Sequence, residues 1–463
     1  MSDEKPDWQG KKLTEANLQE YAEALRHSGW YSKLRSKLYS DHVGIPIQNV
    51  LSITQRISEY EHILIAAAFE DFCKEAGYIR GQSFKVWDDD ISAPEYINIE
   101  IEPEVFKRGW GEGNIFLKTP NGESIVVEMA SSGSRLYTYE VLCRKEGADA
   151  AQKFLNDSRA YAKSHNFLKG KKINPAFKHI KLDRKYTWDD VILPEKVKKE
   201  LKLNIDSLFN NIEAYKKAEL PFKRGIMLKG VPGTGKTLIG KILCSTVGCS
   251  FVWVTPRFVR EAKDVSDIYE LVRDLSPAIL FLEDMDLYTK HREQSTDMGL
   301  LGELMNQLDG LTTNEYVVTI ATTNRAEQIE EALRSRPGRF DRSYEIKLPE
   351  ATQREALLKL YINRGDCVCD LTELDYKALA DATDGMTGSH VRELVTTAII
   401  SAIDDKSYKK EKIHLTRRHF EESVKRVKKK KNADVGFKSP ADLSPVESES
   451  LRWKRLMDDD YDY

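Results

Sequence analysis

The segment around Lys236 has the residue types and the spacing of a phosphate-binding loop. Its pattern is a glycine, four residues, a second glycine, a lysine and a hydroxyl residue, and it consists of Gly230, Val231, Pro232, Gly233, Thr234, Gly235, Lys236 and Thr237. Glycines let the backbone curl so that successive N–H groups point at phosphate oxygens. We expect Lys236 to reach the terminal phosphates of a nucleotide and the Thr237 hydroxyl to bind Mg²⁺.

The residues on either side of the loop favour the same interpretation. The apolar run from Gly225 to Leu228 predicts a buried strand before the loop, and a helical run begins at Leu238 after it. A helix that begins at the loop adds the partial positive charge of its N-terminus to the site. A loop between a strand and a helix is much more specific than the pattern alone.

A second group of candidate residues lies further along the chain. The apolar run from Ala278 to Leu282 predicts a buried strand, and Glu283 and Asp284 follow it directly. Carboxylates at the carboxyl end of a strand beside a phosphate loop can hold the water shell of a metal and orient an attacking water. The alternative is a strand that simply ends in solvent, and the loop upstream favours the catalytic interpretation.

The elements that must position these residues alternate between strands and helices from residue 186 to residue 350. Such alternation predicts a parallel sheet covered by helices on both faces. Residues 351–430 have a helical pattern throughout. We therefore expect an α/β fold, a P-loop NTPase sheet with a helical lid. The predicted strands are Gly225–Leu228, Phe251–Val254, Ala278–Leu282, Val317–Ala321 and Tyr344–Ile346.

Residues 1–165 predict a separate α+β domain in front of this sheet. Apolar residues at helical spacing run from Leu13 to Gly77, and alternating strand patterns run from Phe84 to Cys143. Asn121 and Gly122 form a good hairpin turn between two of those strands. The domain has no chemical motif, and we assign it to the binding of a client or partner.

Two further segments have biased composition. Residues 166–185 are basic and predict a linker, and their lysines, with Lys425 to Lys431, leave contact with nucleic-acid phosphates open as an alternative. Residues 431–463 are polar and end in an acidic, tyrosine-containing run, which predicts a disordered tail.

Bulk composition argues against several classes of protein. The longest apolar run, Ile63 to Phe69, is far shorter than the roughly 20 residues that a membrane-spanning helix needs. The polar start has no apolar core of a signal peptide. The six cysteines include one close pair, Cys367 and Cys369, with a spacing that fits no common zinc or redox pattern. We expect a soluble protein of a reducing compartment, most simply the cytoplasm.

Taken together, the motifs between Tyr186 and Val427 resemble the ATPase module of the AAA family in order and spacing. The segment from Trp188 to Val191 resembles the part of the module that passes the adenine. The other matching segments are Leu304 to Leu311, Ala321 to Asn324 (sensor 1), Arg336 to Arg342 (arginine fingers) and Gly385 to Ser389, the start of the lid helix.

The resemblance implies roles for individual residues. Asp190, Val191, Leu238, Gly388 and Ser389 would lie against ATP. Asn324 would hydrogen-bond the attacking water or the γ-phosphate. Arg339 and Arg342 would reach the site of a neighbouring subunit, so the chain would form a ring with itself, most often a homohexamer; a local salt bridge is the alternative for both.

The pair of acids departs from the family order, because glutamate here precedes aspartate. By position, Glu283 would hold the shell of the Mg²⁺ ion and Asp284 would polarise the water. Aspartate is one methylene shorter than glutamate, and displacements of that size affect rates strongly. A few family members share the swapped order, and the division of labour between the two acids stays open at this stage.

Three other positions bear on mechanism. The segment from Arg260 to Asp264 stands where threading members carry an aromatic tip on the loop that faces the central pore, and a charged loop suits a folded or charged client. Val191 and its two apolar successors replace glycines, with a modest effect expected on base preference. Arg392 could reach the γ-phosphate or sit on the outer face of the lid helix.

The leading hypothesis is a Mg²⁺-dependent ATPase that remodels a protein client. A slow, nucleotide-controlled assembly switch or scaffold is the alternative, and a nucleic-acid-associated ATPase is a weaker one.

Overall fold

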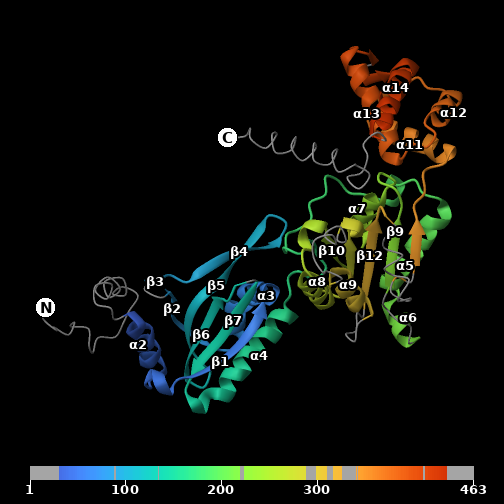
Figure 1. The fold of residues 1–463 in the computed structure, drawn as a ribbon. Helices are drawn as coiled ribbons and strands as arrows, with labels where there is room; N and C mark the ends of the chain where they lie inside the picture. The colour runs from blue at the N-terminus through green and yellow to red at the C-terminus, as the bar shows by residue number, and fades with distance from the viewer. Residues whose placement is uncertain are drawn as a thin grey trace, which may run out of the picture. The chain divides into compact units, whose positions relative to one another are not determined.

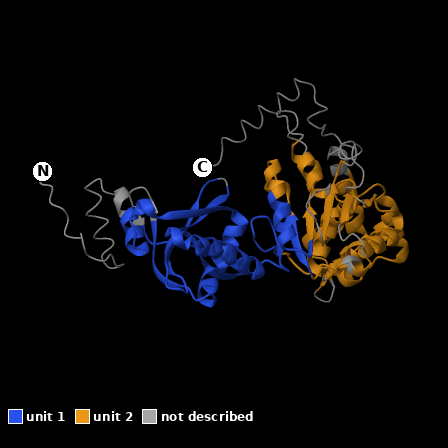
Figure 2. Ribbon diagram, turned by 90° about the horizontal axis from the view of Figure 1, so that it is seen from below, with its two compact units in different colours: residues 1–181, 249–253, 267–278 blue, residues 182–248, 254–266, 279–463 orange. Residues whose placement is uncertain are grey.

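The computed structural model describes most of the chain between residues 31 and 434. The described ranges are 31–87, 90–133, 135–218, 224–287, 299–309, 316–325, 340, 342–365, 367–409 and 412–434. The chain divides into two compact units, which Figure 2 shows in different colours. Unit 1 comprises residues 1–181, 249–253 and 267–278, and unit 2 comprises residues 182–248, 254–266 and 279–463.

The amino-terminal part of the chain is built on a seven-stranded antiparallel sheet (Figure 1). The strand order is β1-β7-β6-β5-β2-β3, and β4 pairs with the first half of the long strand β5. The Asn121–Gly122 turn joins β5 to β6 as expected, with Gly122 at φ 84° and its N–H bonded to the Thr119 carbonyl. The strands are β1 (Leu51–Ser58), β2 (Ile79–Trp87), β3 (Asp90–Ser92), β4 (Glu95–Glu102), β5 (Val105–Lys118), β6 (Ser124–Ser131) and β7 (Leu136–Cys143).

Helices pack on both faces of this sheet. The helices are α2 (Tyr31–Val43), α3 (Glu59–Glu75) and α4 (Ala148–Ser164). Leu38 of α2 packs in a cluster with Phe116, whereas the neighbouring Ile115 and Leu117 are buried on the opposite face. Phe154 of α4 contacts Phe69 and Phe72 of α3, so these two helices share one core. The predicted α+β class of this region is confirmed.

One element of this region corrects the prediction from the sequence. The helical pattern expected from Leu13 to Gly77 is interrupted by β1, which pairs with β7 along its whole length. The strand lies between α2 and α3, and the hydroxyl of its last residue, Ser58, caps α3 by accepting the Glu61 N–H. Short apolar segments cannot be assigned to helix or strand by spacing alone, and here the partner strand decides.

The second sheet of the chain is parallel and has six strands. Its order is β13-β9-β12-β11-β10-β8, with β9 in parallel register with both β12 and β13. All five predicted strands are present. The strands are β8 (Lys172–Ile173), β9 (Arg224–Lys229), β10 (Ser250–Val254), β11 (Ala278–Leu282), β12 (Val317–Thr323) and β13 (Arg342–Glu345).

Helices alternate with these strands, as the pattern predicted. They are α5 (Glu195–Asn210), α6 (Ile212–Lys217), α7 (Lys236–Thr246), α8 (Ala262–Asp274) and α9 (Gly299–Asp309). Within the segment expected to be a linker, β8 pairs in parallel with β10. Short 3₁₀ helices lie at Ile47–Asn49, Lys145–Gly147, Trp188–Asp190, Pro256–Phe258 and Met285–Leu287.

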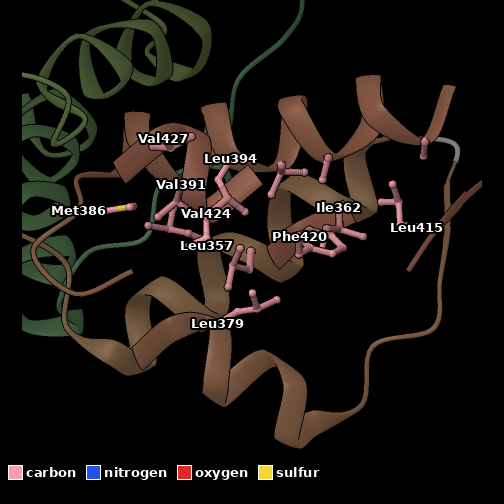
Figure 3. Close-up of a cluster of buried hydrophobic side chains, with 14 residues drawn as sticks. Leu357, Ile362, Leu379, Met386, Val391, Leu394, Leu415, Phe420, Val424 and Val427 are labelled. Atoms are coloured by element: carbon pink, nitrogen blue, oxygen red, sulfur yellow. The ribbon is translucent and has the colours of Figure 1, made fainter. Parts of the chain in front are cut away.

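The lid has a core of its own, shown in Figure 3. Its helices are α11 (Ala351–Arg364), α12 (Glu373–Ala382), α13 (Gly388–Asp404) and α14 (Arg417–Asp434). Leu358, Val391, Leu394 and Phe420 are fully buried among them. The prediction of helices throughout was wrong in one respect, because β14 (Cys367–Cys369), β15 (Tyr408–Lys409) and β16 (Lys412–Leu415) form a small sheet.

The prediction for the C-terminal segment falls almost wholly outside the described residues. The expected tail lies there apart from residues 431–434, which end α14. Among the residues that are described, no helix is both long and apolar enough to span a membrane.

Candidate functional site

The phosphate-binding loop connects β9 to α7 and depends on glycine at three positions. Gly230, Gly233 and Gly235 have φ values of 158°, 80° and 107°. A side chain at Gly230 would meet the Ile346 carbonyl oxygen at 2.3 Å, and one at Gly233 would meet the Ser389 hydroxyl at 2.7 Å. The loop therefore needs glycine both for its backbone conformation and for close approach to its neighbours.

Lys236 begins α7 and its side chain folds back into the loop. Its residue is only 5% exposed, and its Nζ donates to the carbonyl oxygens of Gly230 at 2.6 Å and Val231 at 2.9 Å. Burial lowers the pKa of the ammonium group, although the negative charges of Asp284 and Asp286 act to raise it. The ammonium group is thus held at the mouth of the loop, where phosphate oxygens can replace the two carbonyl groups.

Thr237 and Glu283 meet across the start of α7 and the end of β11. The Thr237 hydroxyl donates to Glu283 Oε1 at 2.6 Å. A hydroxyl and a carboxylate are oxygen ligands, which Mg²⁺ prefers, and this ion keeps several waters while it binds one or two protein groups and phosphates. The pair therefore fits a magnesium ion at the phosphates.

Asp284 lies beside this pair in a strained backbone conformation, with φ 50°. Aspartate is one of the few residues that tolerate this left-handed region. Its N–H donates to the Thr322 hydroxyl at 2.9 Å, and its Oδ1 accepts the Asn324 side-chain amide at 3.1 Å. Burial raises the pKa of the Asp284 carboxyl, and the nearby negative charges of Glu283 and Asp286 raise it further.

Asp286 belongs to the acids that end the predicted strand, but the sequence interpretation gave it no role of its own. It is buried at 3% exposure, and its Oδ1 accepts both the Thr323 hydroxyl at 3.1 Å and the Asn324 backbone N–H at 2.9 Å. It therefore ties the end of β12 to the end of β11 and fixes where Asn324 stands. The signal in the sequence was a third acid just after the first two.

The lid closes over the phosphate loop through the start of α13. The Ser389 N–H and hydroxyl approach the Gly233 carbonyl oxygen at 3.1 and 3.3 Å. Thr387 caps α13 by accepting the His390 N–H. Arg392, one turn further along the helix, is exposed and lines the same cavity, so its side chain faces the nucleotide site.

The segment from Asp183 to Pro194 and α11 also line the cavity. Val191 is buried, and Asp190 Oδ1 accepts Arg184 Nη2 at 2.8 Å and forms an ion pair with Arg364. Arg184 and Arg364 were not predicted, because nothing in their local sequence marks them as partners of Asp190.

The phosphate-binding loop, the start of α13, α11 and the segment from Asp183 to Pro194 together line one cavity of about 880 Å³. This is within the usual volume range of ligand pockets, roughly 300–1,000 Å³. Most of the predicted site residues line it: Asp190, Val191, Pro232, Gly233, Thr234, Gly235, Lys236, Thr237, Leu238, Asp284, Asn324, Gly388 and Ser389.

The predicted arginine fingers lie elsewhere. Arg339 is outside the described residues. Arg342 begins β13 opposite Ile226, is exposed, and does not line the cavity. The phosphate loop follows Lys229, the last residue of β9, whereas Arg342 is in register with Ile226, three residues before that end.

The loop before α8 is charged, as the sequence predicted. The Asp264 carboxylate accepts the N–H groups of Arg260 and Glu261 at 2.8 and 3.0 Å, which fixes the loop at the start of the helix. Arg257, Arg260 and Lys263 are exposed.

Comparisons with known proteins point to one family. Residues 226–348 match the family described as "ATPase family associated with various cellular activities (AAA)". The ATP-dependent zinc metalloprotease FtsH 2 of Petrotoga mobilis is 29% identical over 266 residues, which is 55% of this chain and 41% of that protein. FtsH 4 of Sphaerobacter thermophilus is 34% identical over 254 residues, 52% of this chain and 37% of that protein.

The similarity extends beyond bacterial proteases. A putative cell division cycle ATPase of Plasmodium falciparum is 29% identical over 257 residues, 53% of this chain and 20% of that protein. The aligned part of this chain spans 41% or less of these three relatives. Among the described residues of this chain, no group of three or more His, Cys, Asp or Glu side chains is placed to hold a metal ion.

Proposed function

This chain is a member of the AAA family of ATPases, and from that membership we propose that it hydrolyses ATP with Mg²⁺ and uses the energy to remodel a protein client. The observation that carries the proposal is that two pairs of side chains are in contact beside the phosphate-binding loop. Thr237 contacts Glu283 at 2.6 Å, and Asn324 contacts Asp284 at 3.1 Å.

Each residue has a distinct part in the proposed reaction. Magnesium, when bound, would neutralise charge on the β- and γ-phosphates. Thr237 and Glu283 would hold the ion and its waters, and Lys236 would exchange its two carbonyl partners for phosphate oxygens. Asp284 would accept a proton from the attacking water, which Asn324 orients. A carboxyl with a raised pKa suits this role, because a base is most effective with a pKa near the working pH.

We further propose that the active form is a ring, most simply a homohexamer. Arg342 is exposed and does not line the cavity of its own chain, which supports a role in the site of a neighbouring subunit. A guanidinium placed there would stabilise charge on the transferred phosphoryl group. Mixing Arg342→Ala with Lys236→Ala should restore part of the turnover, since some interfaces then contain one intact site. Mixtures as inactive as the separate variants would contradict shared sites.

The client is proposed to be a folded or charged protein bound through residues 1–165. The loop before α8 and the start of that helix expose Arg257, Arg260 and Lys263 and lack an aromatic tip, which favours contact with a charged surface over the gripping of an unfolded chain. A slow nucleotide-controlled switch or scaffold remains the alternative, and stimulation of turnover by a client separates the two.

The nucleic-acid alternative loses support from two ion pairs of the basic segment. Lys171 pairs with Glu102 at 2.8 Å, and Lys181 pairs with Glu104 at 2.9 Å. Charges that are already paired within the chain have less to gain from phosphates.

The test is steady-state ATP turnover of the wild type and of Asp284→Asn, together with particle mass with and without ATP. Turnover that falls in the variant, with ATP-stabilised hexamers, is the expected result. Tight ATP binding and ring formation with negligible turnover in the wild type would favour the switch. A protein that binds no ATP would refute the proposal.

A further inference from the structure

The part of the cavity lined by Asp190, Val191 and Arg364, here called the base end because the family resemblance places the adenine beside Val191, is joined to the lid by a charged contact. Arg364, the last residue of α11, forms an ion pair with Asp190 Oδ1, and its Nη2 also lies 3.4 Å from the Asp190 carbonyl oxygen. Next to this pair, Ile192 packs against the apolar core of the lid. Residues 174 positions apart in the chain thus close this end of the cavity.

Asp190 holds a second arginine at the same oxygen atom. Arg184 Nη2 lies 2.8 Å from Oδ1, while Oδ2 accepts the Thr187 N–H at 2.7 Å. The Arg184 guanidinium also stacks on the Tyr186 ring, 4.1 Å from the ring centroid. Arg184 and Tyr186 belong to the same segment as Asp190, so this partner stays with Asp190 whatever the lid does.

We propose that the Arg364–Asp190 pair is a latch that sets the rate at which nucleotide leaves the site, and that Arg184 weakens this latch. The inference rests on the proposed function, because it assumes that ADP occupies this cavity. Opening the base end separates α11 from Asp190 and breaks the ion pair. The Asp190 side chain is only 10% exposed, so its carboxylate would destabilise the open state if it were left there without a counterion.

Arg184 weakens the latch in two ways. It remains beside Asp190 when Arg364 departs, so the carboxylate keeps a counterion in the open state. In the closed state it competes for Oδ1 and brings a second positive charge close to Arg364, which weakens the latch. The two arginines, although both are bound to one carboxylate, are therefore expected to affect nucleotide release in opposite directions.

The experiment measures release of fluorescently labelled ADP from the full-length protein by stopped flow, after a chase with unlabelled ADP. Arg364→Ala should release ADP about tenfold faster than wild type, which corresponds to about 1.4 kcal/mol. Arg184→Ala should release it several-fold more slowly. Arg364→Lys should lie between Arg364→Ala and wild type, since lysine keeps the charge without the planar fork.

Two further variants separate a latch from other roles. Asp190→Asn leaves Arg364 in place, and faster release in this variant that does not add to the effect of Arg364→Ala in the double variant shows that the two residues act through their ion pair. Lys359→Ala is the matched control, because Lys359 lies on the same helix and pairs with Glu355 and Glu373 outside the cavity. Its release rate should equal that of the wild type.

The outcomes distinguish this inference from the proposed function. Wild type that binds no labelled ADP would contradict the proposed function itself. Wild type that binds ADP, with unchanged release in Arg364→Ala and Asp190→Asn, would overturn the latch alone. Faster release in Arg184→Ala would also overturn it, because Arg184 would then strengthen the closed state.

Discussion

The two ends of the nucleotide cavity are built on different principles. The phosphate end consists of residues that come from contiguous motifs, such as Gly233, Lys236 and Thr237. The base end is closed by charged side chains that meet across 174 positions, Asp190 and Arg364. Changes at the first end are therefore expected to alter the chemical step, and changes at the second to alter how long nucleotide stays bound.

The largest effect is expected at Asp284. Asp284→Asn keeps the size of the side chain but removes its capacity to accept a proton, so kcat should fall by roughly 10²- to 10⁴-fold. ATP affinity should stay close to that of wild type. Glu283→Gln should also reduce turnover, to a smaller extent. Turnover and nucleotide affinity measured on both variants check the order, and an Asp284→Asn protein with most of its activity would show that another group activates the water.

Asp286 should have a smaller effect on the same step. In Asp286→Asn, the Thr323 hydroxyl and the Asn324 N–H lose a charged acceptor, and the Asn324 side chain is no longer held at its present distance from Asp284. Displacements of this kind reduce rates without removing a reacting group. We expect kcat to fall about tenfold with little change in KM, a split that steady-state kinetics measures directly.

A loss of folding stability would give a different result for Asp286→Asn. Thermal melting should be run beside the kinetics, because the residue is buried. A rise in KM with unchanged kcat would mean that Asp286 serves binding and not the positioning of Asn324.

The substitution Gly233→Ala would test whether the lid must contact the phosphate loop. A methyl group there would lie 2.7 Å from the Ser389 hydroxyl and 2.9 Å from the Thr387 hydroxyl, on a backbone at φ 80°. Gly233→Ala should therefore push the lid away and cost about 1–2 kcal/mol of stability. ATP affinity should drop several-fold by titration calorimetry.

Gly248→Ala is the matched control for that change. Gly248 lies in the connection between α7 and β10, and a methyl group there meets nothing within 4 Å. It should bind ATP like wild type. Equal affinities in the two alanine variants would mean that contact between Gly233 and Ser389 is dispensable.

The sequence predicted the phosphate end because its chemistry is local. A glycine pattern between a strand and a helix, and acids at the end of an apolar strand, each identify themselves within a few residues. Asp286, Arg184 and Arg364 could not be found in this way, because their importance depends on partners that only the fold brings close. Asp190 was predicted from the family resemblance, not from its two arginines.

The same difference holds for the fold. The long alternation of strands and helices predicted the parallel sheet, and all five predicted strands are present. The strands that were missed are mostly short, such as β8 with two residues and β14 with three. Segments of this length have no periodicity of their own, so they become strands only because a partner such as β10 or β16 offers its edge.

The smallest expected effect concerns the charge of Asp190. Burial alone would raise its pKa, but the hydrogen bonds from Arg184 and the Thr187 N–H and the charge of Arg364 lower it below the ordinary 3.8. A carboxyl with a lowered pKa stabilises the fold above its unfolded pKa, and that contribution is lost as the pH falls through the lower folded value. Asp190→Asn should therefore melt a few degrees below wild type at pH 7, and the difference should shrink only below about pH 4.

Melting curves of the two proteins between pH 7 and pH 3 measure this difference directly. Other carboxyl groups titrate in the same range, but they do so in both proteins and cancel in the comparison. A difference that stays constant down to pH 3 would mean that Asp190 stabilises the base end by shape and neutral hydrogen bonding. The long-range ion pair would then not be what holds the base end together, because asparagine can also accept the Thr187 N–H.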